Sequence, residues 1–303
     1  MKDSLPLIKL ILSMVIFGTI GVCVRGIDAE RGFIACIRGI VGAMFIATAL
    51  LAMKKRPSLS AIKKNLLILI LSGAAIGANW ILLFESYSYT TIAVSTLCYY
   101  MAPVFVIIAT LLINREKIGT QKIISVAIAI VGMLFLSGVP GGNIGRRDVI
   151  GIALALGAAL LYATVTLLTK RLTDISPYDV TLVQLGVAGL TVLPYTLLFE
   201  SRSFTNGETS TVLLLITVCL LHTGVAYLLF FSSIKDLPAV TVASFSYIDP
   251  IVAVLLSLAL REPMTLTMGV GAVLIIAGLI ASETDFKKLS ALQSSSDNKT
   301  KEN

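Results

Sequence analysis

The sequence predicts an all-α integral membrane protein in which ten transmembrane helices form two inverted five-helix repeats. Three observations lead to this prediction. Hydrophobic residues fill 56% of the 303 positions and charged residues only 14%, whereas a soluble domain is about 25% charged. The apolar residues gather in runs long enough to cross a bilayer, and the two halves of the chain resemble each other.

The apolar runs define the expected spans. A helix needs about 20 mostly apolar residues to cross the hydrocarbon core, and runs this long and continuous are incompatible with barrel strands. The first run lacks a convincing signal-peptide cleavage site, so we expect it to remain as the first helix. In chain order the runs cover residues 5–24, 32–53, 65–84, 91–113, 120–138, 148–169, 178–199, 211–232, 239–260 and 266–282.

The distribution of basic residues predicts the orientation. The net charge is +7, but 23 of the 24 Lys and Arg residues lie between or at the ends of apolar runs, so nucleic-acid binding is not expected. Loops after even-numbered spans carry eleven Lys and Arg residues, mainly around residues 54–64, and loops after odd-numbered spans carry six. The positive-inside rule therefore places both termini in the cytoplasm. The polar tail at residues 283–303 is expected to be a disordered cytoplasmic segment.

The internal repeat appears when the sequence is shifted by 147 positions. Trp80 then falls on Tyr227, and a Tyr-x-x-Pro pattern recurs in both halves. Because each half contains five spans, an odd number, the second half must cross the membrane in the opposite sense. Inverted repeats of this kind are typical of carriers that rock around a central site. The identical pairs include Gly77 with Gly224, Phe84 with Phe231, Ser86 with Ser233, Tyr100 with Tyr247 and Pro103 with Pro250.

Several short motifs resemble a known family. They are Phe-Gly-Thr-Ile-Gly at residues 17–21, Arg38-Gly39, Ala102-Pro103, Arg115-Glu116, and Pro250 with Arg261-Glu262. With them the chain resembles the drug/metabolite transporter superfamily, and specifically its two-repeat EamA-type members. The resemblance implies one repeat over residues 5–138 and another over 148–282, a central cavity, and transport of small organic solutes, often outward.

Motifs of enzymes and cofactor sites are missing from the sequence. It contains no P-loop, no His-Glu-x-x-His and no Gly-x-Ser-x-Gly, and its single histidine, His222, precludes a multi-histidine metal site. We therefore expect no catalytic residue, cofactor or metal. The cysteines lie in apolar runs without CxxC spacing and are expected to be buried thiols: Cys23, Cys36, Cys98 and Cys219.

Charged residues inside spans are candidates for function, because they are costly to place in a membrane. Arg38 and Glu85 are expected either to bind substrate or to pair with each other or with the backbone as a structural anchor near the outer surface. Asp249 precedes Pro250 and could bind a proton or cation that drives transport, or be satisfied locally. His222 could relay protons, but an interhelical hydrogen bond is the simpler interpretation.

Aromatic residues suggest a substrate cavity. Trp80, Phe84 and Tyr87 share one face of a helix, although Tyr87 also suits the interfacial belt. Three tyrosines stand one turn before the helix-interrupting Pro103 and Pro250, and such a set could bind amphipathic or cationic solutes by stacking and cation–π contacts. The tyrosines are Tyr99, Tyr100 and Tyr247.

Together these features predict a secondary transporter that exports amino acids or related solutes by alternating access, with protons as the candidate coupling ion. The alternatives are an importer of quaternary amines such as choline, and a lipid-carrier flippase or accessory subunit. The expected partners are a small-molecule substrate and the lipid bilayer of the cell (plasma) membrane, with monomer and homodimer both left open.

Overall fold

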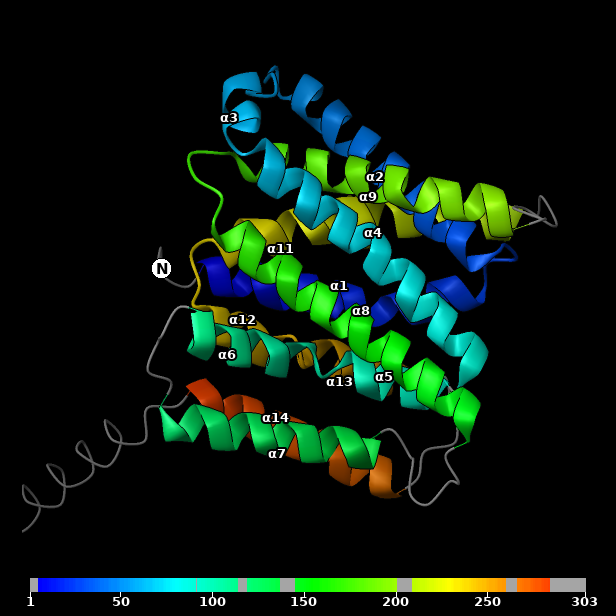
Figure 1. Cartoon of the computed structure of the whole chain (residues 1–303), viewed down its shortest axis with the longest axis vertical. Helices are drawn as coiled ribbons and strands as arrows, with labels where there is room; N and C mark the ends of the chain where they lie inside the picture. The colour runs from blue at the N-terminus through cyan, green and yellow to red at the C-terminus, as the bar shows by residue number, and fades with distance from the viewer. Residues whose placement is uncertain are drawn as a thin grey trace, which may run out of the picture.

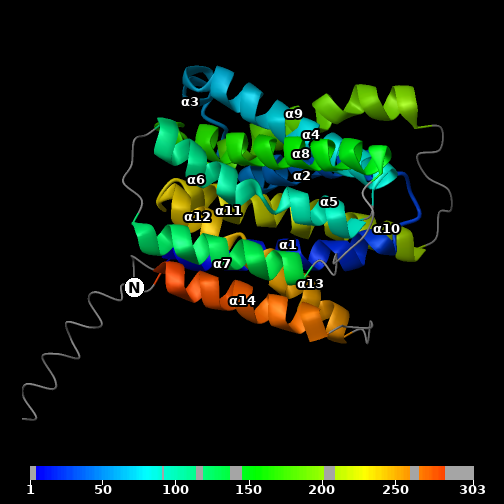
Figure 2. The same ribbon diagram turned by 60° about the horizontal axis from the view of Figure 1, so that its bottom comes forward.

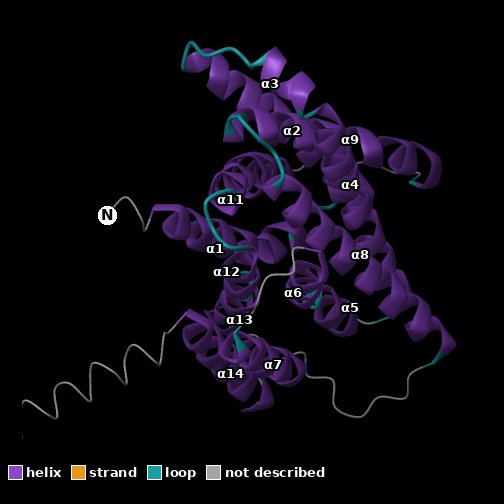
Figure 3. Ribbon diagram, turned by 60° about the vertical axis from the view of Figure 1, so that its left-hand side comes forward, coloured by secondary structure: helices purple, strands orange, loops and turns teal. Residues whose placement is uncertain are grey.

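The computed structural model describes residues 5–90, 92–113, 119–136, 145–200, 209–259 and 266–283. Within these ranges every regular element is a helix and no strand occurs (Figure 3). The all-α prediction is therefore confirmed for the described part. The Arg-Glu pairs at 115–116 and 261–262 and the tail after residue 283 lie outside it.

Among the described residues, six helical stretches are long and apolar enough to cross a membrane. Many of their large apolar side chains point outward, such as Leu67 and Leu197, which are 70% and 73% exposed. Such surfaces suit lipid, so the chain is a multi-pass membrane protein. The stretches are α1 (Leu5–Arg25), α2 (Arg31–Ala52), α4 (Leu66–Tyr89), α8 (Arg146–Lys170), α9 (Pro177–Phe199), and the continuous run of α10 (Thr209–Thr217), the π-helix η1 (Val218–Val225) and α11 (Ala226–Ile234).

The expected spans at 91–113 and 239–260 are each broken in two. Residues 100–101 and 246–247 interrupt them, just before Pro103 and Pro250. Proline has no amide hydrogen and fits the first turn of a helix, so each proline starts a new helix instead of continuing the old one. The resulting pairs are α5 (Ile92–Tyr99) with α6 (Ala102–Ile113), and α12 (Ala239–Phe245) with α13 (Ile248–Ala259).

The remaining helices are α3 (Leu59–Lys64), α7 (Thr120–Leu136) and α14 (Leu266–Glu283). The short α3 was expected to be a loop; it forms because the Ser58 hydroxyl caps it by accepting from the Ala61 amide at 3.4 Å. Helices α7 and α14 pack on each other at one edge of the bundle (Figures 1 and 2). Helix α4 packs on α8 and α9, and α1 packs on α11 and α13.

Glycines bring the long helices into backbone contact. A Cβ atom on Gly39 of α2 would lie 2.7 Å from the Gly189 amide nitrogen of α9, and one on Gly77 of α4 would lie 2.7 Å from the Ala188 carbonyl oxygen. A Cβ on Gly73 would lie 2.7 Å from the Val187 Cβ. Gly73 and Gly77 therefore allow α9 to approach α4 closely, as small residues commonly do between membrane helices.

Polar contacts tie the two halves together at one end of the bundle. The Asn65 side chain donates to the Thr173 carbonyl at 2.9 Å and accepts from the Thr173 amide at 3.1 Å. Next to it, the Lys64 ammonium lies 2.7 Å from an Asp174 carboxylate oxygen. This hydrogen bond and the positive charge of Lys64 lower the pKa of Asp174.

We predict that Gly189→Ala destabilises the protein in detergent. Its new methyl group would meet Ile40 atoms at 2.8 and 2.9 Å, and overpacking of this kind costs about 1–3 kcal/mol. Gly186→Ala on the same helix is the matched control, because its methyl group would meet only the Ala43 Cβ, at 3.8 Å. Equal unfolding temperatures for the two variants would contradict the close α2–α9 contact.

Candidate functional site

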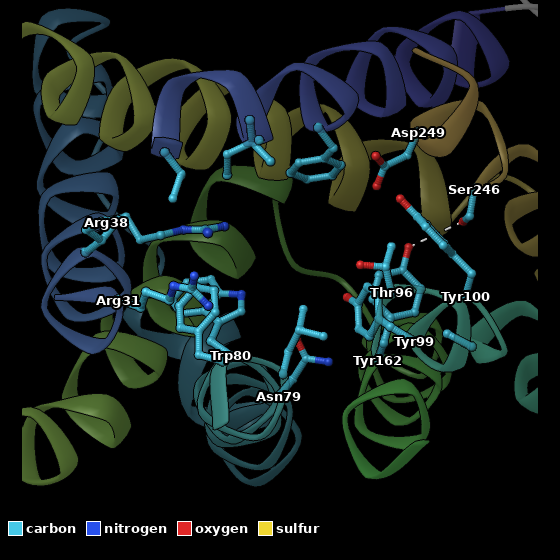
Figure 4. Close-up of a pocket in the computed structure, with 18 of the residues that line it drawn as sticks. Arg31, Arg38, Asn79, Trp80, Thr96, Tyr99, Tyr100, Tyr162, Ser246 and Asp249 are labelled. Carbon is cyan, nitrogen blue, oxygen red and sulfur yellow. Dashed lines mark hydrogen bonds between the residues drawn. The ribbon is translucent and has the colours of Figure 1, made fainter. Parts of the chain in front are cut away.

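A cavity of about 620 Å³ lies inside the bundle and is lined from α1, α2, α4, α5, α6, α8, α11 and α13 (Figure 4). Helix α1 reaches the beginning of α13 because Gly18 has no side chain. A Cβ atom there would lie 2.6 Å from the Asp249 carbonyl oxygen. The glycine therefore brings α1 against α13, and both helices then line the cavity.

Arg38 forms one wall of this cavity. The residue is 7% exposed, and its guanidinium carbon lies 4.3 Å from the centroid of the Trp80 ring. Its Nε donates to the Thr223 hydroxyl at 3.2 Å, while the Trp80 indole donates to the Tyr227 hydroxyl at 3.3 Å. No carboxylate in the described ranges forms an ion pair with Arg38. Its charge is consequently available to an anionic group in the cavity.

Asp249 forms the opposite wall (Figure 4). It lies in the first turn of α13, where the helix dipole favours a negative charge. The hydroxyl of Tyr100 points toward its carboxylate (Figure 4). Tyr99 and Tyr162 pack edge to face beside it with centroids 6.1 Å apart, and the Tyr162 hydroxyl lies 3.4 Å from the Ser246 hydroxyl. An acid among tyrosine rings is suited to binding a cation.

Aromatic rings connect the two walls. Tyr227 packs edge to face on Phe17, with centroids 5.1 Å apart, and on Trp80, with centroids 6.2 Å apart. Phe230 lies 6.1 Å from Phe17 and 6.0 Å from Tyr162, measured between centroids. All five of these residues line the cavity. The cavity therefore has a basic end and an acidic end with an apolar aromatic surface between them.

A second arginine and its neighbours lie where the cavity reaches the beginning of α2. Arg31, which sequence analysis assigned to a loop, is the first residue of α2 and lies 5.2 Å from the Tyr87 ring centroid. The next residue, Gly32, donates its amide hydrogen to the Glu200 carboxylate at 2.6 Å. Burial raises the pKa of Glu200, which follows the last residue of α9.

Some residues predicted from sequence meet at the cavity and others do not. Glu85 does not pair with Arg38; its carboxylate accepts from the Tyr195 hydroxyl of α9. Tyr247 is 1% exposed and is not part of the lining. The predicted residues that do line the cavity are Arg38, Trp80, Tyr99, Tyr100, Pro103 and Asp249, with Phe84 and Tyr87 beside them.

His222 and Pro250 also lie outside the lining. The Nε2 atom of His222 lies 2.8 Å from the Thr19 hydroxyl of α1, and its Nδ1 atom lies 3.4 Å from the Thr217 carbonyl oxygen. This is the interhelical hydrogen bond that a lone intramembrane histidine commonly makes.

Several lining residues were not singled out from the sequence. Asn79 is a polar residue inside a span, which is itself a signal of function, and its side chain donates to the Ala158 carbonyl at 2.6 Å. Tyr227 occupies the repeat position of Trp80, so the internal symmetry could have indicated it. No sequence pattern pointed to three further lining residues with hydroxyl groups, Thr96, Tyr162 and Ser246.

The described side chains around this cavity do not form a metal-binding group. Among the described residues, no group of three His, Cys, Asp or Glu side chains could hold a metal ion. The cavity instead offers charges, hydroxyl groups and rings, which are groups that bind organic solutes.

Comparison with known proteins gives the same family for both halves of the chain. The model of the EamA-like transporter family matches residues 4–138 and again residues 149–283. A Bacillus subtilis (strain 168) protein named uncharacterized transporter YxxF is 29% identical over 92% of this chain and 89% of its own length. An uncharacterized transporter of Archaeoglobus fulgidus is 27% identical over 89% of this chain and 93% of its own.

A solved crystal structure of a protein shares the fold. It superposes with a TM-score of 0.80 over 91% of this chain and 95% of its own, at 16% sequence identity. Both halves of the chain match one family model, and the curated relatives are named as transporters. The chain therefore belongs to the EamA-like transporter family and is a membrane transporter rather than an enzyme.

Proposed function

We propose that this transporter is a secondary carrier of small zwitterionic metabolites, most simply amino acids, which it exports by alternating access. The observation that carries the proposal is the pair of opposite charges in one cavity. Arg38 lies on one wall and Asp249 on the other, with aromatic rings between them (Figure 4). A solute with a carboxylate and an ammonium group would satisfy both charges at once.

Alternating access requires two halves that can move against each other, and we propose that these are inverted repeats of five spans each. A shift of 147 residues relates α1 to α8, α2 to α9, α4 to the α10–α11 stretch, and α7 to α14. The break after α5 and the break after α12 then also coincide, at Tyr100 and Tyr247. The four remaining spans would be supplied by the α5–α6 pair, the α12–α13 pair, α7 and α14.

The packing of the helices supports the same symmetry. Helix α4 packs on α8, and their repeat mates α11 and α1 pack on each other. Two further pairs, α2 with α9 and α7 with α14, join equivalent helices. A pseudo-two-fold axis in the membrane plane produces this pattern. It relates one packed pair to a second equivalent pair, and it maps a pair of equivalent helices onto itself.

We further propose that both termini lie in the cytoplasm and that the chain resides in the plasma membrane. The excess of Lys and Arg in loops after even-numbered spans supports the orientation. In that orientation Arg31 and the beginning of α2 would lie toward the outside. Asp249 would be the coupling group that exchanges protons during the cycle, because among the described residues it is the carboxylate that lines the cavity.

A quaternary-amine carrier is the second candidate. The tyrosines around Asp249 favour it, since Tyr99, Tyr100 and Tyr162 could surround a cationic head group. Such a solute would leave Arg38 without an anionic partner, which is why the zwitterion is preferred.

We predict that amino acids raise the unfolding temperature of the purified protein. A ligand that binds only the folded state stabilises it by about 2.7 kcal/mol at 100 times its Kd. Arg38→Gln and Asp249→Asn should each weaken this binding about tenfold or more, because each removes a charged hydrogen-bonding partner. Glu85→Gln is the control, since Glu85 lies outside the cavity lining.

Other ligands would separate the alternatives in the same assay. Stabilisation by choline that needs Asp249 but not Arg38 would favour the amine carrier. Stabilisation by prenyl phosphates alone would replace the proposal with a lipid-carrier flippase.

We predict that Asp249→Asn abolishes the dependence of transport on a pH gradient in proteoliposomes. An amide does not bind or release a proton near neutral pH. At a solute concentration that saturates the weakened site, exchange of labelled solute without a gradient should continue while gradient-driven transport is lost. Asp236→Asn serves as the control, because Asp236 is an exposed acid in the loop after α11. A variant at Asp249 that still responds fully to the gradient would remove this residue from the coupling mechanism.

A further inference from the structure

A π-helical turn interrupts an otherwise regular apolar helix beside the cavity. The turn η1 (Val218–Val225) lies between α10 and α11. Such turns are rare and occur frequently at functional sites, because the wider winding costs stability and redirects side chains. Here the Thr223 hydroxyl donates to the Val218 carbonyl, five residues earlier, at 2.9 Å. The hydrogen of the Thr223 hydroxyl group therefore already takes part in a hydrogen bond within the turn.

The oxygen of the same hydroxyl group faces α2 and accepts from Arg38. The Arg38 Nε lies 3.2 Å from it. The guanidinium also stacks on the Trp80 ring, with its central carbon 4.3 Å from the ring centroid. The hydrogen bond at Nε and this stacking together fix the orientation of the guanidinium. The N–H donors on the two terminal nitrogens lie beside the Tyr227 hydroxyl group, and the guanidinium points into the cavity (Figure 4).

Close packing fixes the turn against α2. Thr223 is fully buried, and a Cβ atom on Gly42 of α2 would lie only 3.0 Å from its methyl group. On the other side of the turn, His222 is hydrogen-bonded to Thr19 of α1 at 2.8 Å. The turn thus contacts both α1 and α2, two helices that line the cavity.

We propose that Thr223, held by the η1 turn, is a positioning residue that orients the Arg38 guanidinium toward the carboxylate of the substrate. The substrate part of this inference rests on the proposed function. The orientation of Arg38 is a property of the ligand-free protein and can be tested alone. In a regular α-helix the hydroxyl group would bond three or four residues back, whereas the π-turn gives it a partner five residues back.

The single tryptophan of the chain gives a direct readout. Trp80 contacts the Arg38 guanidinium, so its emission spectrum reports on that contact. Arg38→Gln defines the spectrum without the cation. We expect Thr223→Val, which keeps the shape but loses the hydroxyl group, to shift the emission in the same direction and by a comparable amount. Thr223→Ser should restore the wild-type spectrum, because it restores the hydroxyl group.

Thr217→Val is the matched control, because the Thr217 hydroxyl donates only within its own helix, to the Leu213 carbonyl at 2.9 Å. Its spectrum should equal that of the wild type. A Thr223→Val spectrum that also equals the wild type, in a folded and monodisperse sample, would overturn the proposal. So would a shift that Thr223→Ser fails to reverse.

Failure of the proposed function would be seen in the thermal-stability assay with amino acids and not in these spectra. If no amino acid stabilises the wild-type protein, the zwitterion hypothesis fails while the spectra of ligand-free variants still test Thr223. If amino acids do bind, Thr223→Val should weaken that binding about tenfold, because Arg38 loses a charge-assisted hydrogen bond that orients it.

Discussion

The absence of water from the bilayer interior constrains this structure more than any single contact. Each backbone group and each charge in a span must find a partner within the protein. Irregular backbone is accordingly located where the protein has an internal cavity. Tyr100 and Ser246, at the two helix breaks, line that cavity, and the π-turn η1 holds one of its charged residues. The helix breaks, the π-turn and the buried charges, which are costly in a membrane, therefore lie together around the cavity.

The two charges of the cavity are stabilised by different means. Arg38 is held by the Trp80 ring and one hydroxyl group, whereas Asp249 occupies the first turn of a helix. Within the part of the chain that the structure describes, neither charge has an ion-pair partner of opposite sign. A buried charge without a counter-ion favours binding of a ligand group of opposite charge. Such unpaired charges are consistent with a site that binds and releases solutes repeatedly.

The sequence predicted much of the fold because apolar runs and prolines act locally. Spans such as 178–199 differ from the observed helix by one residue, and Pro103 and Pro250 indicated both breaks. The site was harder to predict. Glu85 and Trp80 lie on the same helix, but only the packing of α9 decides that Glu85 meets Tyr195. Tyr162 carried no signal, because a single tyrosine in an apolar run suits lipid, core or cavity equally well.

The contact between Gly39 and Gly189 has a mechanical consequence. Eight residues of α2 precede Gly39 and thirteen follow it, so the helix extends about 12 Å to one side and about 20 Å to the other. With no side chain between the backbones, this point can serve as a pivot. A tilt of about 10° around it would move the two ends by about 2 and 3 Å in opposite directions. One small rotation would therefore narrow the bundle at one face while widening it at the other.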